Sequence, residues 1–332
     1  MSGMGASRLD RYGVAEAGAA ERRVGFFLAP TFAMLPFVSA LEPLRAANRY
    51  SRRPLYAWRC LSLDGAPVAA CNGMQQAVDG DITSAGKLDL LVVCGPHDPL
   101  DYRDKRLFQW LRQQAAAGVA LAALDTGSLL LARAGLLDGC RCTLHWENLP
   151  GFVEEFPGIE VSGELFAIDG RRYTCAGGTA ALDMLLWLIG QQHGHALATQ
   201  VSELFIHSAI RQQQQPQRMD LRARTGVCHP RLLECIELME ANVEQPLTLC
   251  ELAEVTGTSK RQLERLFRRY LHSSPGRYYL QLRLRAGRKL LEQTSLPIIE
   301  VACACGFSSA GHFSQRFRAL FGQTPRQARA AP

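Results

Sequence analysis

Two patterns of apolar and polar residues divide this chain. Up to about residue 190, short apolar runs alternate with amphipathic stretches, which is typical of an α/β fold. The runs predict strands over Val24–Leu28, Trp58–Leu63, Leu88–Val93, Val119–Leu124 and Ile159–Ala167. The amphipathic stretches predict helices over Phe32–Arg49, Asp104–Ala117, Ser128–Ala134 and Thr179–Gln191. Two of the predicted strands, Leu88–Val93 and Val119–Leu124, are almost wholly apolar, as central parallel strands covered on both faces are.

After about residue 190 the α/β pattern gives way to a linker and then to a helical pattern. A helix over Leu197–Arg211 is expected next, and the polar stretch from Gln212 to Gly226 is typical of a linker. From Cys228 onward the pattern is helical. The 332 residues therefore divide into a disordered Gly/Ala/Arg-rich tail (1–22), an α/β domain (23–192), a helix and linker (193–227) and an all-helical domain (228–332).

An internal repeat is the sharpest feature of the helical domain. ELAEVTGTSKRQLERLFRR (251–269) resembles VACACGFSSAGHFSQRFR (301–318). The matched pairs are Ala253 with Ala302, Gly257 with Gly306, Ser259 with Ser308, Leu263 with Phe313, Phe267 with Phe317, Leu271 with Phe321 and Pro275 with Pro325. Each copy predicts a helix, a turn that contains glycine, and a second helix capped by Ser259 or Ser308. The sequence therefore predicts two helix-turn-helix units.

The second helix of each copy has an apolar face and a polar face at about 100° per residue. The faces expected to be buried consist of Leu263, Leu266, Phe267 and Tyr270 in the first copy, and Phe313, Phe317, Leu320 and Phe321 in the second. The side chains expected at DNA are Ser259, Lys260, Arg261, Glu264, Arg265 and Arg268, then Ser309, Gly311, His312, Gln315 and Arg316. Arginine can bond guanine and glutamate can accept from cytosine, so the first copy is expected to read bases. The second copy is expected mainly to bind the backbone.

The distribution of charge favours a polyanionic partner for this domain. The whole chain carries 37 Lys+Arg and 31 Asp+Glu, a net charge of +6, while residues 258–332 alone hold 14 basic and 3 acidic side chains. A basic helix over Pro275–Gln293 is expected to set the spacing of the two units, which must be roughly 34 Å to reach successive major grooves. On this helix we expect Arg288 to contact phosphate. The alternative is a helical bundle with an accidental basic face.

Residues 229–329, which close in GFSSAGHFSQRFRALFGQTPRQAR (306–329), resemble the DNA-binding domain of AraC/XylS transcription regulators. Residues 23–192 resemble the flavodoxin-like, class I glutamine-amidotransferase-like sandwich. The motifs that carry this second resemblance are EPLRAANR (42–49), CGPHDP (94–99), LDTGS (124–128), ARAGLLDG (132–139), LHWEN (144–148) and CAGGTAALD (175–183). Together the two halves are similar to the GlxA-type subfamily of AraC regulators. The resemblance implies promoter DNA, RNA polymerase and a small-molecule effector as partners, and an activating role. A homodimer is expected as well, because paired half-sites raise affinity through effective concentration.

In enzymes of that α/β fold, a sharp turn between a strand and a helix presents a nucleophilic cysteine. By the resemblance, Asp125 stands at that position, so no catalytic residue is expected. The expected ligand pocket consists of Glu42, Gly95, His97, Asp125, Thr126, His145 and Trp146. Its carboxylates and its indole favour a cation. The resemblance implies quaternary amines or amino acids such as carnitine, glycine betaine or arginine.

Several alternatives stay open. The chain could be an amidase- or peptidase-like enzyme with a DNA-binding tail, or a DNA-binding protein without ligand control, and Asp125 could simply cap the next helix. No charge-free apolar stretch is long enough for a membrane span, so a cytoplasmic protein with eleven reduced cysteines is expected. His193 and His195 lack a third metal ligand, so neither a metal nor a cofactor is expected.

Overall fold

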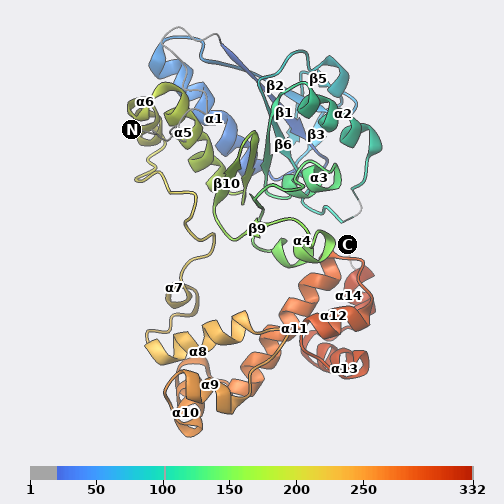
Figure 1. Cartoon of the computed structure of the whole chain (residues 1–332), viewed down its shortest axis with the longest axis vertical. Helices are drawn as coiled ribbons and strands as arrows, with labels where there is room; N and C mark the ends of the chain where they lie inside the picture. The colour runs from blue at the N-terminus through green and yellow to red at the C-terminus, as the bar shows by residue number, and fades with distance from the viewer. Residues whose placement is uncertain (1–20, 101, 331–332) are drawn as a thin grey trace, which may run out of the picture. The chain divides into compact units, whose positions relative to one another are not determined.

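The computed structural model describes residues 21–100 and 102–330. Contacts divide the chain into a unit that ends at Gln217 and a unit that begins at Arg218 (Figure 1). All but two residues of the predicted tail, 1–22, lie outside the described residues, and Arg22 already begins the first strand. The predicted helix and linker, 193–227, is shared between the two units.

A seven-stranded sheet forms the centre of the N-terminal unit, in the order β10-β11-β7-β6-β1-β2-β5. Its strands are β1 (Arg22–Leu28), β2 (Tyr56–Ser62), β5 (Gly80–Asp81), β6 (Leu90–Cys94), β7 (Ala120–Leu124), β10 (Phe166–Asp169) and β11 (Arg172–Cys175). All neighbouring strands are parallel except β10 and β11. Two small sheets accompany it, β3 (Val68–Ala69) with β4 (Gln75–Gln76) and β8 (Cys142–Thr143) with β9 (Val161–Ser162).

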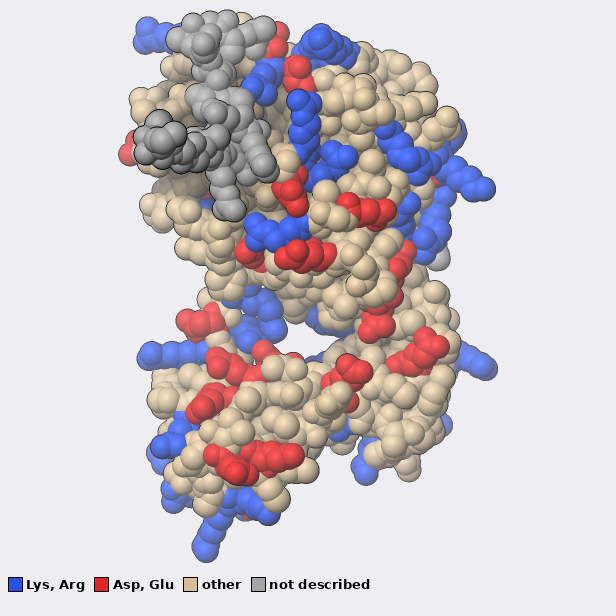
Figure 2. All heavy atoms as spheres, in the orientation of Figure 1, with Lys and Arg blue, Asp and Glu red and all other residues tan. Residues whose placement is uncertain are grey.

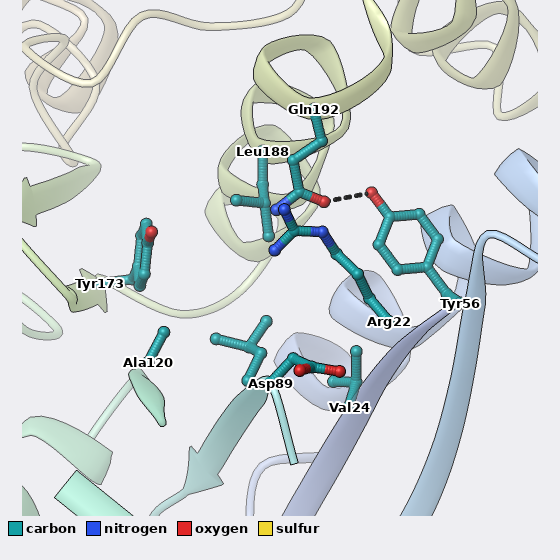
Figure 3. A pocket seen from close by; sticks show the side chains of 9 residues that line it. Arg22, Val24, Tyr56, Asp89, Ala120, Tyr173, Leu188 and Gln192 are labelled. Carbon is teal, nitrogen blue, oxygen red and sulfur yellow. Dashed lines mark hydrogen bonds between the residues drawn. The ribbon is translucent and has the colours of Figure 1, made fainter. Parts of the chain in front are cut away.

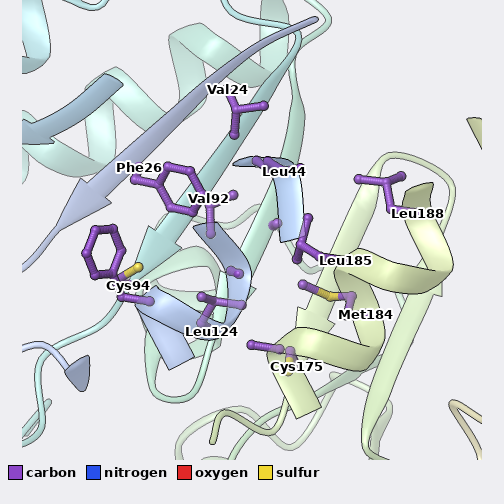
Figure 4. Close-up of a cluster of buried hydrophobic side chains, with 14 of the residues drawn as sticks. Val24, Phe26, Leu44, Val92, Cys94, Leu124, Cys175, Met184, Leu185 and Leu188 are labelled. Carbon is purple, nitrogen blue, oxygen red and sulfur yellow. The ribbon is translucent and has the colours of Figure 1, made fainter. Parts of the chain in front are cut away.

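Helices cover both faces of this sheet (Figure 1). One face packs against α1 (Met34–Ser51), α5 (Ala180–His193) and α6 (His195–Leu204), and the other against α2 (Lys105–Ala116) and α3 (Gly127–Arg133). The short helices η2 (Ile82–Ser84) and α4 (Leu149–Glu155) complete the unit. Side chains alternate along each strand, so Phe26 packs in the first core and Phe27 in the second. Figure 4 shows the first core, where Val92 and Leu124 of the sheet lie near Met184 and Leu185 of α5. The predicted fold class is confirmed.

Two predicted elements differ from the structure. The strand expected over Ile159–Ala167 is interrupted, and its second half turns back at Gly170, with φ +54°, to pair with β11. Strand β11 was not predicted, because its residues do not form an apolar run. The helix expected over Leu197–Arg211 ends at Leu204, because Ile206 adopts a left-handed conformation with φ +55°.

The C-terminal unit is helical, as predicted. Its helices are α7 (Leu221–Thr225), α8 (Pro230–Ala241), α9 (Leu249–Val255), α10 (Lys260–Leu271), α11 (Pro275–Gln293), α12 (Ile298–Ala304), α13 (Ala310–Phe321) and α14 (Pro325–Ala330). They bury two apolar cores, and α11 contributes to both, with Tyr279 in the first and Leu284 in the second. Helix α11 also approaches α13 closely, since a Cβ on Gly287 would lie 2.8 Å from the Phe313 ring. One rigid helix therefore connects the two helix-turn-helix units.

Candidate ligand and nucleic-acid sites

The turn between β7 and α3 presents Asp125 at the carboxyl end of the sheet. Asp125 is left-handed, with φ +58°, and its N–H donates to the Cys175 carbonyl at 3.0 Å. The buried Thr126 hydroxyl donates to the Pro96 carbonyl at 2.6 Å. A Cβ on Gly95 would lie 2.3 Å from the Gly127 nitrogen, so the β6 loop needs glycine at this close approach. These contacts hold the turn in one conformation.

Burial raises the pKa of the Asp125 carboxyl, while His145 and His97 act in the opposite direction. Glu147 adds to the increase, and the N–H of Thr126 opposes it. The turn thus brings a carboxyl group and two imidazoles, which come from three separate loops, into one electrostatic environment. Such a perturbed group at a strand end is typical of a binding site.

The structure brings most of the predicted pocket together. Gly95, His97, Asp125 and Thr126 meet at the turn, and the Trp146 ring lies 5.7 Å from that of His145. The exception is Glu42, which bonds Arg45 at 2.6 Å on α1 and is not among the charged groups that shift the pKa of Asp125. Arg45 lies one turn along the same helix, and this ion pair neither places Glu42 in the pocket nor excludes it, so its role there stays a prediction.

Sequence reasoning overlooked Gly177 as part of this site. A Cβ on Gly177 would lie 2.9 Å from the Asp125 Cβ, and its φ is +89°. The Asp125 side chain therefore lies directly against the backbone of the loop that follows β11. The signal was present, because Gly177 stands in the CAGGTAALD motif.

The helix cap does not account for Asp125. Helix α3 begins at Gly127, its N-cap residue is Thr126, and no side chain makes a cap hydrogen bond there. Asp125 stands one residue too early to bond the N–H groups of the second or third helical residue, as a cap does. Capping of α3 therefore does not explain the aspartate at this position.

The thiols nearest to this turn are poor nucleophiles. Cys94 and Cys175 pair in register with Leu124, directly before Asp125, and both are buried. Burial raises the pKa of Cys175 to about 12 and that of Cys94 well above its usual value. Thiol catalysis needs the thiolate, which these groups do not form at neutral pH. Within residues 21–100 and 102–330, no cluster of His, Cys, Asp and Glu could hold a metal ion.

Replacement of Asp125 by asparagine should stabilise the chain increasingly as pH rises from the ordinary carboxyl pKa of 3.8 toward neutrality. A raised pKa means that the folded state binds the proton more tightly, so wild-type stability declines as pH rises through the raised value. Asparagine cannot ionise and tolerates the left-handed conformation, whereas Asp125→Ala should cost about 1 kcal/mol from strain. Urea unfolding of the three proteins between pH 4 and 8 measures this. A difference between Asp125→Asn and wild type that does not change with pH would contradict it.

A cavity with a volume of about 30 Å³ lies at the amino ends of the strands, away from Asp125 (Figure 3). Arg22, Asp89 and Tyr173 line it, and Tyr56 donates a hydrogen bond to Gln192 at 2.7 Å. This volume accommodates one or two water molecules rather than a metabolite. We therefore place the candidate ligand site at Asp125.

Helix α10 has the surface that a recognition helix needs. Ser259 caps it by accepting from the N–H of Gln262 at 3.2 Å. Leu263, Leu266 and Phe267 are buried, as predicted, but Tyr270 is exposed and lies near His229. The basic side chains predicted to face DNA, Lys260, Arg261, Arg265 and Arg268, are exposed, and Glu264 is half-buried. Figure 2 shows basic side chains at the lower end of this unit, where α10 lies.

Helix α13 repeats the arrangement with one difference in the turn. Its cap is Ser309, which accepts from the N–H of His312 at 3.3 Å, and not Ser308. The extra residue of the second copy therefore lies between Gly306 and the cap. Phe313 and Phe317 are buried, while Leu320 is 36% exposed, contrary to its predicted inward position. The predicted DNA-facing residues Gly311, His312, Gln315 and Arg316 are exposed.

Two arginines of α11 have different environments. Arg283 is half-buried, donates to the carbonyls of Cys305 (2.8 Å) and Gly306 (2.5 Å), and stacks on Phe307. It therefore holds the turn of the second unit rather than facing solvent. Arg288 is exposed, bonds Glu292 at 2.7 Å and lies over the Phe321 ring. Of these two arginines, Arg288 is the one with a surface position from which a phosphate could be reached.

Comparisons with known proteins match both halves of the chain. The DJ-1/PfpI family model matches residues 22–191, and a helix-turn-helix domain model matches residues 252–331. The HTH-type transcriptional regulators GbdR and CdhR of Pseudomonas aeruginosa are 48% and 49% identical over 92% of this chain, and the matches cover 83% and 90% of those proteins. GlxA of Rhizobium meliloti, also an HTH-type transcriptional regulator, is 39% identical over 92% of this chain and 94% of its own length.

A solved structure agrees with these relatives. The crystal structure of an AraC family transcriptional regulator from Pseudomonas putida is 33% identical, with a TM-score of 0.52, and covers 55% of this chain and 99% of that one. Within the part of the chain that the structure describes, no helix is both long and apolar enough to cross a membrane.

Proposed function

Because this chain belongs to the AraC-type helix-turn-helix transcription regulators with a DJ-1/PfpI-type N-terminal domain, we propose that a small metabolite bound at Asp125 controls how it regulates promoters. The C-terminal unit binds DNA, as the family does. The N-terminal unit is a receptor that has kept the fold of an enzyme family without its thiol chemistry. In this proposal the protein is an activator that works in the cytoplasm as a homodimer and contacts RNA polymerase.

The observation that carries the receptor role is the carboxyl group of Asp125. It is held in a left-handed turn, it does not cap α3, and its pKa is raised by burial. A ligand that carries a positive charge would stabilise the ionised carboxylate and offset its cost of burial. His97, His145 and Trp146 add polar and aromatic groups. The proposed effectors are therefore quaternary amines or amino acids of the carnitine, glycine betaine and arginine class.

A thermal-shift screen of the full chain against glycine betaine, L-carnitine and L-arginine tests this proposal. A ligand at 100 times its Kd should stabilise the N-terminal unit by about 2.7 kcal/mol. Asp125→Asn should remove the stabilisation, because it removes the charge and keeps the shape. Glu154→Gln is the matched control and should retain the shift, because Glu154 is exposed on α4 and lies outside the predicted pocket. Equal shifts in both variants, or turnover of a substrate by the N-terminal unit, would contradict the proposal.

A further inference from the structure

The segment that leaves α6 is fastened to α5 by a buried carboxylate. We call residues 206–217 the connector, because Gln217 is the last residue of the N-terminal unit. Asp183 is fully buried and accepts hydrogen bonds from His207 Nε2 at 2.8 Å and from the N–H and Nε of Arg211 at 2.7 and 2.9 Å. Arg211 Nη2 also donates to the Thr179 hydroxyl at 2.7 Å. Charge-assisted bonds to a buried carboxylate are the strong kind.

A second fastening lies at the other end of the connector. Gln217 Nε2 faces three acceptors, the Thr143 hydroxyl at 3.0 Å and the carbonyls of Leu144 and Glu164, both at 2.9 Å. The Leu165 N–H donates to carbonyls of the same glutamine-rich tract. This tract was predicted to be a linker, and the structure instead hydrogen-bonds it to the N-terminal unit.

Both fastenings end on the loops that surround Asp125. Thr179 lies two residues after Gly177, whose backbone lies against the Asp125 side chain. Leu144 directly precedes His145, and the Thr143 carbonyl accepts from Ser128 in the first turn of α3. Any ligand that displaces either loop therefore acts on the hydrogen bonds of the connector.

Two features of the connector oppose the hydrogen bonds that hold it to the N-terminal unit. Ile206 is β-branched, is 92% exposed and adopts φ +55°, a conformation that costs free energy for such a residue. Gln217 Oε1 is buried and has no hydrogen-bond partner among the described residues. Both features favour a state in which the connector is released from the N-terminal unit. The hydrogen bonds to Asp183 and around Gln217 favour the attached state. An element balanced in this way can be shifted by a modest ligand contribution.

The chain passes directly from Gln217 into the DNA-binding unit. Arg218 and Arg224 lie 3.8 and 2.9 Å from the Glu240 carboxylate on α8, which packs against α10. Arg218 and Arg224 hold the start of the C-terminal unit at Glu240. If Gln217 loses its hydrogen bonds, the segment before these arginines that is not bonded to the N-terminal unit becomes longer.

We infer that Arg211 and Gln217 are positioning residues through which occupancy of the Asp125 site changes DNA binding. This inference rests on the proposed function. Ligand binding shifts the connector between a fastened and a released state, and the coupling equals the difference in ligand affinity between those states.

Gln217→Glu in the full chain is the test, because it keeps the size of the side chain and replaces its N–H donor with an acceptor. Gln214→Glu is the matched control, since Gln214 is exposed and its side chain makes no hydrogen bond within the described residues. The readouts are hydrogen exchange of the Leu165 amide, the Kd of whichever of glycine betaine, L-carnitine or L-arginine binds the wild type, and the Kd for a promoter fragment with and without that compound.

We expect Gln217→Glu to raise the exchange rate of the Leu165 amide at least fivefold and to change ligand-free DNA affinity at least threefold. It should keep the compound's Kd within about threefold and abolish the compound's effect on DNA affinity. Gln214→Glu should match the wild type in every readout. Arg211→Gln should repeat the Gln217→Glu pattern, whereas a purely structural role would weaken ligand and DNA binding together.

The experiment distinguishes failure of the proposed effector class from failure of the inferred role of the connector. If none of the three compounds binds the wild type, the proposed effector class is wrong, and the exchange rate and the ligand-free DNA affinity still decide the role of the connector. If Gln217→Glu equals Gln214→Glu in both of those readouts, the inference is overturned. It is also overturned if Gln217→Glu loses ligand affinity as fully as Asp125→Asn, since Gln217 would then belong to the pocket itself.

Discussion

Replacement of Gly306 by alanine should lower the stability of the second helix-turn-helix unit by about 3 kcal/mol. The residue adopts φ +71°, where a Cβ alone costs roughly 1–2 kcal/mol. The new Cβ would also lie 2.6 Å from Pro246 Cγ and 2.8 Å from the Glu244 carbonyl oxygen, which belongs to the backbone and cannot rotate away. Overpacking of this kind typically adds 1–3 kcal/mol. Native-state hydrogen exchange of amides in α12 and α13 measures the loss within the full chain.

Gly322→Ala is the matched control. This glycine ends α13 with φ +74°, and an added Cβ would meet nothing within 4 Å. The substitution should therefore cost only the conformational strain, about 1 kcal/mol. Equal losses in the two variants would mean that the close approach of Gly306 to Glu244 and Pro246 does not matter. A larger loss in Gly306→Ala, accompanied by weaker promoter binding, is the expected result.

Replacement of Arg265 by alanine should weaken binding to a specific promoter fragment by about 1–3 kcal/mol, or roughly 5- to 150-fold. Arg265 is exposed on α10, opposite the buried Leu263 and Phe267, so it occupies the surface expected to face base edges. Binding to scrambled DNA should change much less, because non-specific affinity depends on phosphate contacts. Titrations of both DNAs at several salt concentrations measure the two effects.

Arg222→Ala provides the control for charge. Arg222 is an exposed arginine of α7, outside both helix-turn-helix units, so its loss removes the same charge without touching α10. Its effect should be small and similar for both DNAs. A loss in Arg265→Ala that is identical for specific and scrambled DNA would place Arg265 at the backbone rather than at the bases.

Within the two helix-turn-helix units, some burial predictions from the sequence were correct and others were wrong. The wheel for α10 placed Leu263, Leu266 and Phe267 correctly because burial of those positions follows helical periodicity. It failed for Tyr270, near the end of the helix, because exposure there depends on which helices pack against the last turn. The second cap was misassigned to Ser308 because repeat alignment could not locate the extra residue within the turn.

The candidate ligand site shows the same division. The motifs pointed to Asp125, Gly95, His97 and His145, and the structure places each of them within three residues after the end of a strand. The motifs did not reveal that Glu42 pairs with Arg45 one turn along α1, because that contact depends on side-chain direction. The raised pKa of Asp125 could not be predicted, since it results from burial by loops that are distant in sequence.

The amino-acid sequence by itself determined the fold class, the two helix-turn-helix repeats, the basic charge of the C-terminal unit and the aspartate at the strand–helix turn. These follow from periodicity, composition and local motifs, which depend on neighbours along the chain. Only the tertiary structure decided that Arg283 supports a turn and that Asp183 and Gln217 fasten the connector to the loops around Asp125. The physical reason is that these hydrogen bonds join residues about 20 to 70 positions apart, where no local pattern specifies which donor meets which acceptor.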